Sequence, residues 1–524
     1  MPRVLVADPI AEAGISRLRE HADVDVELRQ NPAALVARIP DYDALIVRSE
    51  TRVDARVIKA GHRLKVIGRA GAGVDNIDVE AATRAGVLVV NAPSGNTIAA
   101  AEHTMAMMLA LARHIPQADQ AVKGGRWERS RFLGTELREK VLGVIGLGSI
   151  GREVAHRAQA FGMRVIATDP VLSEERASQL NVRLMPLDQL MSESDVVTLH
   201  VPLTRETHHL IDTRALALAK PGLRLINVAR GGIVDETALR NALRDGQVAG
   251  AALDVFEQEP PGENPLLSLP QVITTPHLGA STEEAQISVA LEITDQVIAV
   301  LDGGLPRFAL NAPVALPEAM AFLRPFIPVA EGIGRFFAQV GRQPATRLQV
   351  DYVGEIATYD CSVLTAALLT AFLSRFSAER VNPVNARAVA AAHGITVVEQ
   401  RGAHATEFAN LISLQAAGEH GSTRVGGTLL LNEPHIVQFN DFRIDLVPQG
   451  TFLMSWHADR PGVIGAIGTL LGQKNINIAS MQVGRDRPRG DAVMILSVDD
   501  PVPESIQAEI RRIPGMADVL TVTL

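Results

Sequence analysis

Short apolar runs alternate with helix-length amphipathic stretches along the first half of the chain. In the first 95 residues the apolar runs have the length of strands, and stretches between them, such as 10–20, carry apolar residues at helical spacing. The strand-like runs lie at 4–7, 24–28, 44–47, 66–68 and 87–91. Strands that alternate with helices are typical of a parallel sheet covered by helices. The pattern therefore predicts a small parallel α/β unit.

A second alternating series begins at residue 141 and continues to about residue 275. Its strand-like runs lie at 141–145, 164–168, 196–200, 224–229, 251–255 and 272–275. Before it, residues 96–115 are almost wholly apolar and are followed by Pro116, which predicts a buried helix that ends there. After it, Ser281 and the acidic residues that follow indicate the start of a helix that returns the chain to the first unit. The two units would then face each other across a cleft.

The pattern changes after Asn311. A proline-marked boundary at 312–317 leads into a segment that mixes alternating strands with one or two helices up to about residue 450. Its strands are expected at 347–353, 428–431, 436–439 and 443–447, and a buried helix is expected at 361–374. No catalytic constellation stands out in this segment. Residues 451–524 follow the order strand, helix, strand, strand, helix, strand, which is typical of a ferredoxin-like sandwich.

These patterns predict the fold class. The chain is expected to be an α/β protein with two Rossmann-like parallel-sheet domains, an α+β intervening domain and a ferredoxin-like domain at the end. The first domain is expected to comprise residues 1–95 and 284–310, the second 96–283, the third 311–450 and the fourth 451–524. A chain of 524 residues exceeds what one hydrophobic core usually serves, which agrees with several domains.

A glycine-rich turn joins the first strand of the second unit to a helical stretch. The turn reads Gly146-Leu147-Gly148-Ser149-Ile150-Gly151, and Asp169 ends the next strand-like run, eighteen positions beyond the last glycine. Glycines at these positions allow a tight turn, the close approach of a pyrophosphate and the packing of helix on strand. An acid at the position of Asp169 accepts hydrogen bonds from the ribose hydroxyls and repels a 2′-phosphate. The sequence therefore predicts NAD, rather than NADP, as the cofactor.

Composition narrows the class of protein further. The net charge of −9 argues against a nucleic-acid partner, because a general nucleic-acid binder needs a basic face. The single cysteine, Cys361, excludes an intrachain disulfide and fits a reducing compartment. The first residues predict a strand rather than a signal peptide, and no apolar stretch is long enough to span a bilayer. We expect a cytoplasmic protein with no membrane partner and no metal site.

Three charged side chains stand at the ends of strand-like runs in the second unit: Arg230, Glu259 and His277. The carboxyl ends of parallel strands line the cofactor crevice, so all three should face the nicotinamide. Together they suit the oxidation of a 2-hydroxy acid. An arginine orients the substrate carboxylate, a histidine takes the hydroxyl proton, and a carboxylate holds the histidine. Each residue also has a purely structural alternative. Arg230 could cap a surface turn, Glu259 could be one of several loop acids, and His277 could open the next helix.

These motifs together resemble the D-isomer-specific 2-hydroxyacid dehydrogenases. The resemblance rests on the segments 146–151, 227–235, 253–260 and 276–279, and on the substrate-side loops 69–76 and 95–97. The tail, through 457–462 and 475–478, is similar to an ACT domain, which is a small-ligand sensor. With its intervening segment, the chain resembles the long, serine-regulated members of the family that oxidise 3-phosphoglycerate with NAD⁺.

The resemblance implies roles for further residues. It makes the first domain the substrate domain and the second the NAD domain, with His277 as acid/base, Glu259 as its partner and Arg230 as carboxylate clamp. The substrate would also meet the loop of Gly71, Ala72 and Gly73, together with Asn96. NAD would contact Gly146, Gly148, Ser149, Ile150, Gly151, Asp169, Val228, Ala229, Asp254, Gly279 and Ala280. In the tail, His457, Asp459 and Asn477 would bind L-serine, the expected effector, across a subunit interface.

A phosphorylated substrate requires additional positive charge. Arg48 follows the strand-like run 44–47, faces the expected cleft and is the best candidate. A basic cluster around Trp127 either reaches a neighbouring active site or is a solvated loop; it consists of Lys123, Arg126, Arg129 and Arg131. The apolar helix at 96–115 and the tail both favour self-association, and a homotetramer is expected.

Other functions stay open at this point. One is a reductase of another 2-oxo acid, such as glyoxylate or 2-oxoglutarate. A second is a non-catalytic, NAD-dependent binding protein, which Arg230, Glu259 and His277 together disfavour. A third is a pure amino-acid sensor, which would bind serine without turnover.

Overall fold

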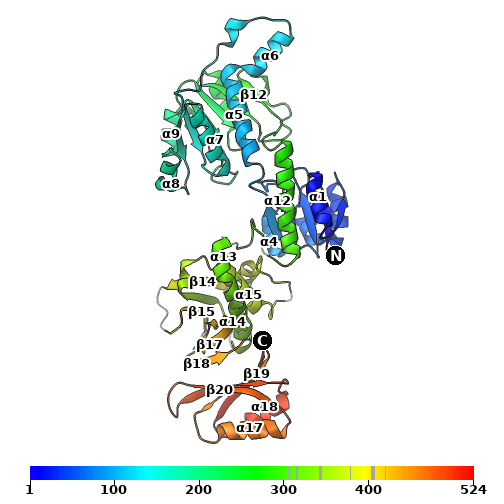
Figure 1. Cartoon of the computed structure of the whole chain (residues 1–524), viewed down its shortest axis with the longest axis vertical. Coiled ribbons are helices and arrows are strands. Elements are labelled where there is room, and N and C mark those ends of the chain that lie inside the picture. Colours follow the sequence, from blue (N-terminus) through cyan, green and yellow to red (C-terminus); the bar gives the residue numbers. More distant parts are fainter. Residues whose placement is uncertain (305, 314–316, 342–344, 378, 403–406, 419–420) are drawn as a thin grey trace.

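The computed structural model describes residues 1–524 except 305, 314–316, 342–344, 378, 403–406 and 419–420. Figure 1 shows four bodies along one long axis, and each is built around its own sheet. The body that contains the N-terminus lies between the glycine-turn body and the C-terminal half of the chain. The predicted fold class is confirmed, whereas the limits of the four domains stay a prediction.

The N-terminal sheet is fully parallel, with strand order β2-β1-β3-β4-β5. Its strands are β1 (Arg3–Val6), β2 (Asp23–Val26), β3 (Ala44–Val47), β4 (Val66–Arg69) and β5 (Leu88–Asn91). Its inner strands are apolar on both faces because helices cover both faces. One face is covered by α1 (Glu12–Arg19) and α12 (Glu283–Leu301), and the other by α2 (Pro32–Arg38), α3 (Ala55–Ala60) and α4 (Val79–Arg84).

Helix α12 comes from far along the chain, yet it packs against α1 and β4 of this first sheet. The helix begins where the side-chain oxygen of Thr282 accepts a hydrogen bond from the backbone N–H of Ala285 at 3.2 Å. The N-cap is therefore Thr282 and not Ser281, from which we expected the helix to start. The returning helix closes one side of the space between the first two sheets.

The second sheet is also fully parallel, with order β12-β11-β10-β9-β6-β7-β8. Its strands are β6 (Val141–Ile145), β7 (Arg164–Thr168), β8 (Arg183–Leu184), β9 (Val196–Leu199), β10 (Leu223–Asn227), β11 (Val248–Leu253) and β12 (Val272–Thr274). One face packs against α5 (Thr97–Arg113) and α7 (Ser149–Ala160), the other against α9 (Leu187–Glu193), α10 (Thr213–Ala217) and α11 (Glu236–Arg244). Helix α8 (Glu174–Gln179) lies beside β8.

The apolar helix that we expected at 96–115 is α5, and it ends earlier than predicted. His114 has a left-handed backbone with φ of +54°, and Pro116 then stands in the first turn of α6 (Ile115–Lys123). Proline is tolerated in a first turn because the N–H it lacks has no partner there. Pro116 therefore starts a second helix instead of ending the first.

The third sheet is mixed, with order β14-β13-β15-β16-β17-β18. Its strands are β13 (Arg347–Gly354), β14 (Thr396–Gly402), β15 (Asn410–Gly418), β16 (Gly421–Leu430), β17 (Glu433–Phe439) and β18 (Phe442–Leu446). Our expectation of one or two helices here was wrong, because the segment contains α13 (Pro317–Leu323), α14 (Ile327–Val340), α15 (Ser362–Leu373) and α16 (Ala386–Ala392). The strands β14 and β15 were also missed, since both are rich in polar and small residues.

The last sheet is antiparallel, with order β20-β21-β19-β22. Its strands are β19 (Thr451–Ala458), β20 (Ile478–Arg485), β21 (Asp491–Val498) and β22 (Met516–Thr523), and its helices are α17 (Val463–Gln473) and α18 (Glu504–Ile510). The predicted ferredoxin-like order is confirmed. The helices cover one face, and the other face shares a hydrophobic core with α14 of the intervening segment. No helix among the described residues combines the length and apolarity needed to cross a membrane.

Candidate functional site

The glycine turn of the second sheet has the geometry that a dinucleotide requires. Gly146 has a φ of +91°, and a Cβ on Gly151 would lie 2.0 Å from the carbonyl oxygen of Gly146. A Cβ on Gly148 would meet nothing within 4 Å, which leaves open space above the turn. Gly148 is the N-cap of α7 and makes no side-chain cap, so the first N–H groups of that helix stay available to an anion, together with Ser149 and Ile150.

Asp169 follows β7 and leans toward this turn. Its carboxylate accepts hydrogen bonds from the backbone N–H groups of Leu147 at 2.8 Å, Val171 at 2.9 Å and Leu172 at 3.0 Å. Burial raises the pKa of Asp169, but these hydrogen bonds outweigh it and hold the pKa below its ordinary value. An ionised carboxylate beside the turn fits the ribose hydroxyls of NAD and repels the extra phosphate of NADP. The residues present therefore fit NAD.

A histidine and a carboxylate form a close pair at the ends of β11 and β12. The Nδ1 atom of His277 lies 2.8 Å from Oε2 of Glu259, and both side chains are about half exposed. Burial raises the pKa of Glu259, but the hydrogen bond and the charge of His277 outweigh it, so the pKa lies below its ordinary value. The structure therefore brings His277 and Glu259 together, as we expected.

The loop that carries His277 is anchored by Asp254, whose side chain is fully buried. One carboxylate oxygen accepts hydrogen bonds from the Thr275 hydroxyl at 2.6 Å and from the Leu278 N–H at 2.7 Å. The other oxygen accepts from the Gly279 N–H at 2.9 Å. His277, between these anchors, has a φ of +56°, a left-handed conformation that few residues adopt without support.

A further histidine, His103 on α5, joins this anchor. Its Nε2 atom lies 3.1 Å from the Thr275 hydroxyl and 3.3 Å from the Asp254 carboxylate. Neither His103 nor Thr275 was among the predicted site residues, because nothing in their local sequence indicates the contact. The direct contact of Asp254 with NAD stays a prediction, since its oxygens already hold the loop. Gly279 lies against Val228, because a Cβ on Gly279 would stand 3.1 Å from a Val228 methyl group.

Arg230 reaches from the second sheet to the loop of the first. Its Nε atom donates to Asp75 at 3.1 Å, and its Nη1 atom donates to the carbonyl oxygen of Ala229 at 2.7 Å. A Cβ on Gly73 would lie 1.9 Å from Nη2 of Arg230. Glycine is therefore required at position 73 so that the guanidinium can approach the loop backbone.

Arg69 is a functional candidate that our sequence analysis missed. Its side chain is mostly buried, its Nε atom has no hydrogen-bond partner, and a Cβ on Gly71 would lie 1.8 Å from its Nη1 atom. Burial first, and then the charges of Arg230 and Arg48, lower the pKa of Arg69 to about 10. Arg69 is the last residue of β4 and pairs with Val47 of β3, so Arg48 follows one position later on the neighbouring strand.

One cavity of about 410 Å³ between the first two sheets brings most of the candidates together. Three guanidinium groups line it, from Arg48, Arg69 and Arg230, and so does the pair of His277 and Glu259. Its wall also includes Gly71, Ala72, Asn96 and Ala280. The side-chain oxygen of Asn96 is buried without a partner, so it can accept a hydrogen bond from a ligand. The cavity therefore combines an acid/base pair with strong positive charge.

The candidate effector residues lie in the last sheet. His457 on β19 is buried and its Nε2 atom has no partner, while Asp459 accepts hydrogen bonds from the Arg489 N–H at 2.9 Å and from Arg485 at 3.3 Å. Asn477 donates to Asp499 at 2.7 Å. Strand β21 lies between β19 and β20, and Asp459 and Asn477 do not hydrogen-bond each other within one chain.

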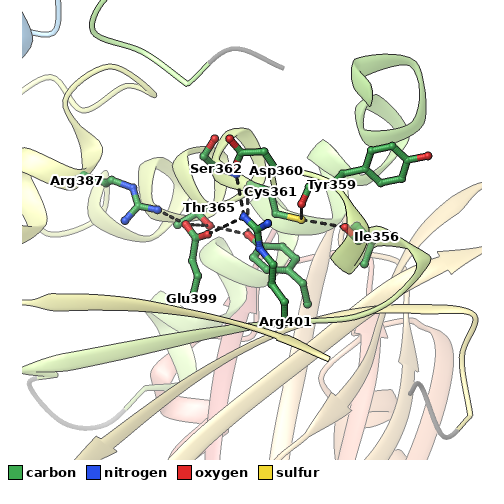
Figure 2. A network of polar contacts seen from close by, with 10 residues as sticks. Ile356, Tyr359, Asp360, Cys361, Ser362, Thr365, Arg387, Glu399 and Arg401 are labelled. Carbon is green, nitrogen blue, oxygen red and sulfur yellow. Dashed lines mark hydrogen bonds and ion pairs between the residues drawn. The ribbon is translucent and has the colours of Figure 1, made fainter. Parts of the chain in front are cut away.

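A polar network in the intervening segment surrounds the single cysteine (Figure 2). The Cys361 thiol donates to the carbonyl oxygen of Ile356 at 3.2 Å, and burial raises its pKa to about 12. Nearby, Glu399 accepts from Thr365 at 2.8 Å and pairs with Arg387. These contacts tie α15, α16 and β14 together, and a thiol with a raised pKa is a poor nucleophile. The network is structural, and no cluster of metal-ligand side chains occurs in the described part of the chain.

Three family models match successive parts of the chain. Residues 105–279 match the D-isomer specific 2-hydroxyacid dehydrogenase, NAD binding domain. Residues 322–440 match the D-3-phosphoglycerate dehydrogenase intervening domain, and residues 452–515 match the ACT domain. The chain thus contains an NAD-binding domain and an ACT domain.

Curated relatives match over the full length. The chain is 49% identical to the D-3-phosphoglycerate dehydrogenase of Synechocystis sp., covering 100% of this chain and 95% of that protein. It is 44% identical to the enzyme of the same name from Archaeoglobus fulgidus, covering 100% of both.

Solved structures match somewhat more than half of the chain. The TT0316 protein from Thermus thermophilus has a TM-score of 0.55 and 38% identity, covering 59% of this chain and 99% of that chain. D-lactate dehydrogenase from Aquifex aeolicus, complexed with NAD and lactic acid, has a TM-score of 0.53 and 30% identity, covering 57% of this chain and 96% of that chain.

Two glycines of the turn should separate NAD binding from stability. A Cβ at Gly148 meets only open space, so Gly148→Ala should keep the thermal midpoint of the cofactor-free protein and weaken NAD binding by about tenfold or more. A Cβ at Gly151 clashes with the Gly146 carbonyl, so Gly151→Ala should lower that midpoint through a loss of roughly 1–3 kcal/mol of stability. Thermal unfolding and NAD titration measure both. Equal effects of the two changes on stability would contradict the assignment.

Proposed function

Because the chain belongs to the D-3-phosphoglycerate dehydrogenases, within the D-isomer-specific 2-hydroxyacid dehydrogenase family, we propose that it oxidises 3-phospho-D-glycerate with NAD⁺. The products are 3-phosphohydroxypyruvate and NADH, and the reaction is the first step of L-serine biosynthesis. The observation that carries the proposal is the His277–Glu259 pair in a cavity lined by three guanidinium groups. That set combines a base for the C2 hydroxyl with charge for a carboxylate and a phosphate.

The proton is moved by His277. Its Nδ1 atom faces the ionised Glu259, which favours the tautomer with hydrogen on Nδ1 and leaves Nε2 to accept the proton of the C2 hydroxyl. Bound NAD⁺ supplies the acceptor for the hydride that leaves C2. The lowered pKa of Glu259 means that the pair contributes stability fully above the ordinary carboxyl pKa of about 4.3 and loses it as pH falls through the lowered value. The pair is thus intact at neutral pH.

The substrate carboxylate is held by Arg230, which presents a planar fork, and by backbone N–H groups of the loop from Gly71 to Gly73. Asn96 accepts a hydrogen bond from a substrate hydroxyl with its unpartnered oxygen. Arg48 and Arg69 bind the phosphate, since both guanidinium groups line the cavity and neither has a carboxylate partner among the described residues.

Two groups of cofactor residues complete the proposal. The turn from Gly146 to Gly151 holds the pyrophosphate, and Asp169 holds the ribose. Val228, Ala229, Asp254, Gly279 and Ala280 surround the nicotinamide end.

The proposal also divides the chain into four domains, with limits at residues 95, 283, 310 and 450. Residues 284–310 return to the first domain, which binds the substrate.

The other chemistries that we considered fit less well. Solved neighbours include a glyoxylate reductase and a D-lactate dehydrogenase, whose substrates are not phosphorylated. A substrate with a single carboxylate requires one guanidinium group, that of Arg230, and leaves the charges of Arg48 and Arg69 without a partner. A non-catalytic NAD-dependent protein or a pure sensor has no need of the His277–Glu259 pair.

The ACT domain supports regulation by an amino acid, and we propose L-serine. His457, Asp459 and Asn477 bind its carboxylate and amino group, and a second subunit completes the site because β21 separates the two segments. The Asp459 carboxylate suits the amino group, and interactions with Arg489 and Arg485 hold its pKa below the ordinary value.

We also propose that the protein associates into a homotetramer and that it is located in the cytoplasm. Helix α6 and the loop after it project away from the second body in Figure 1. This arm carries Trp127, which is 79% exposed, and Leu133, which is 87% exposed, next to Arg126, Arg129 and Arg131. Large apolar side chains exposed together on one projecting arm favour a contact with another subunit there.

The reaction is tested by NADH formation from 3-phospho-D-glycerate and NAD⁺. Removing the base by His277→Asn should lower kcat by about 10²- to 10⁴-fold without weakening NAD binding, since asparagine tolerates the positive φ. The matched control is His209→Asn, because His209 also has a positive φ and also contacts a glutamate, Glu257, at 3.1 Å. Equal activity of the two variants would remove His277 from its role.

The pH profile tests the partner of the base. Glu259 favours the protonated imidazole, so Glu259→Gln should move the pH at which oxidation reaches half its maximum to lower values. The measurement is kcat/KM between pH 5 and pH 9 for both forms. A parallel fall at every pH, with the midpoint unchanged, would argue against the pairing.

Serine regulation is tested in the tail. Asn477→Ala should raise the serine concentration needed for half inhibition by about tenfold or more and leave the uninhibited rate unchanged. Gln473→Ala, an exposed residue at the end of α17, is the control and should behave as the unmodified protein. Loss of the uninhibited rate in Asn477→Ala would indicate a structural role instead.

The arm is tested by sedimentation. Trp127→Ala should shift the protein toward smaller assemblies, because a buried tryptophan at an interface often contributes about 2 kcal/mol or more. Val171→Ala removes an exposed apolar side chain of the same body that lies outside the arm, and it should leave the assembly unchanged. An unchanged assembly in Trp127→Ala would exclude the arm from the interface.

A further inference from the structure

The segment that carries Arg48 begins at the same sheet edge as a buried aspartate. Strands β1 and β3 are parallel neighbours, with Val6 paired to Ile46, so the residues after both strands emerge side by side. Asp8 follows β1, and Arg48 follows β3. Asp8 has no exposed surface, which is unusual for a carboxylate.

Asp8 binds the backbone at both ends of the segment 48–51. Its Oδ2 atom accepts hydrogen bonds from the N–H of Arg48 at 2.6 Å and from the N–H of Thr51 at 3.1 Å. Its Oδ1 atom accepts from the Thr51 hydroxyl. The carboxylate therefore fixes the spacing of the two residues that bound this short loop.

Asn76 binds the carbonyl groups of the same two residues. Its Nδ2 atom donates to the carbonyl oxygen of Arg48 at 2.7 Å and to that of Thr51 at 2.6 Å. The backbone of Asn76 also accepts from the N–H of Val53 at 2.8 Å. The clamp, formed by Asp8 and Asn76, thus engages the N–H and the carbonyl of both Arg48 and Thr51.

A clamp is needed because Arg48 faces two like charges. Arg48, Arg69 and Arg230 line one cavity, and the only partner of the Arg48 guanidinium among the described residues is the Pro9 carbonyl oxygen, at 3.4 Å. Repulsion between the guanidinium groups favours an outward movement of Arg48, because Arg69 is mostly buried and Arg230 is held by Asp75. Ser49 and Glu50 are exposed, so the loop itself packs too little to resist that movement.

We infer that Asp8 and Asn76 are positioning residues that hold Arg48 against this repulsion and so set the preference for a phosphorylated over a non-phosphorylated substrate. The inference rests on the proposed function, since it assigns the phosphate to Arg48. Neither residue of the clamp lines the cavity, and neither touches His277 or Glu259. Their loss should therefore weaken phosphate binding and leave the proton transfer intact.

The test compares reduction of 3-phosphohydroxypyruvate with reduction of hydroxypyruvate, using NADH and the full-length protein. Thr51→Val removes one hydroxyl at constant shape, and Asp8→Asn keeps an acceptor but removes the charge. Each should lower the kcat/KM ratio of the phosphorylated to the non-phosphorylated substrate by about 10- to 100-fold, mainly through KM. The values for hydroxypyruvate should stay unchanged.

The matched control is Asp43→Asn. Asp43 is also a buried aspartate of this sheet, but it lies at the opposite edge, where it accepts from the Arg3 N–H at 2.9 Å and pairs with Arg63 at 3.0 Å. This change should cost stability without altering the substrate ratio. Thermal midpoints of all variants separate a folding defect from a change in preference.

A double-mutant cycle with Arg48→Met decides between positioning and general stability. If the clamp acts through Arg48, Thr51→Val should have no further effect on the ratio in the Arg48→Met background. Additive effects, or an unchanged ratio in Thr51→Val and Asp8→Asn, would overturn the inference. Failure of the unmodified protein to act on the phosphorylated substrate would instead overturn the proposed function, so the two outcomes are distinct.

Discussion

The site depends on keeping three guanidinium groups, those of Arg48, Arg69 and Arg230, at one cavity. The three like charges repel one another, and the loops that carry them are held against that repulsion. Glycines at 71 and 73 leave the space that Arg69 and Arg230 occupy, since a Cβ at either position would lie within 2 Å of a guanidinium nitrogen. Asp75 neutralises Arg230 from the opposite sheet. The positive charge of the cavity therefore favours a substrate with two anionic groups, a carboxylate and a phosphate.

The acid/base pair depends on a second buried anion. Asp254 fixes the loop on both sides of His277, and the loop gives His277 a backbone conformation that it would not adopt alone. The two aspartates, Asp8 and Asp254, thus perform the same task in different sheets. Each lies at the carboxyl end of a parallel strand, is buried, and accepts backbone N–H groups of a loop that bears a side chain of the cavity, Arg48 or His277.

The two C-terminal bodies share a hydrophobic core, and the first of them also contacts the N-terminal body. Phe452 and Met454 of β19 share a hydrophobic core with α14, and Gln339 of α14 exchanges two hydrogen bonds with the backbone of Thr523. Ahead of α16, Asn382 donates to the carbonyl oxygen of Gly86, between α4 and β5, at 2.7 Å. A displacement of the ACT sheet must therefore move α14 with it, because cores transmit strain rather than absorb it.

The sequence analysis found the residues whose type is required by the chemistry. It missed the residues whose role depends on contacts with distant parts of the chain. The apolar runs predicted both parallel sheets, and Arg230, Glu259 and His277 were expected together because strands of one parallel sheet end at one edge. Asp8, His103 and Arg69 carry no local signal, since each acts on a residue at least 40 positions away or through burial. The strands β14 and β15 were missed for a related reason. Pairing with β13 on either side makes them strands, whereas their own residue pattern does not indicate it. An aspartate shortly after a parallel strand, as Asp8 and Asp254 are, is nevertheless a position that sequence can mark for inspection, because a carboxylate buried there must find hydrogen-bond donors in a neighbouring loop.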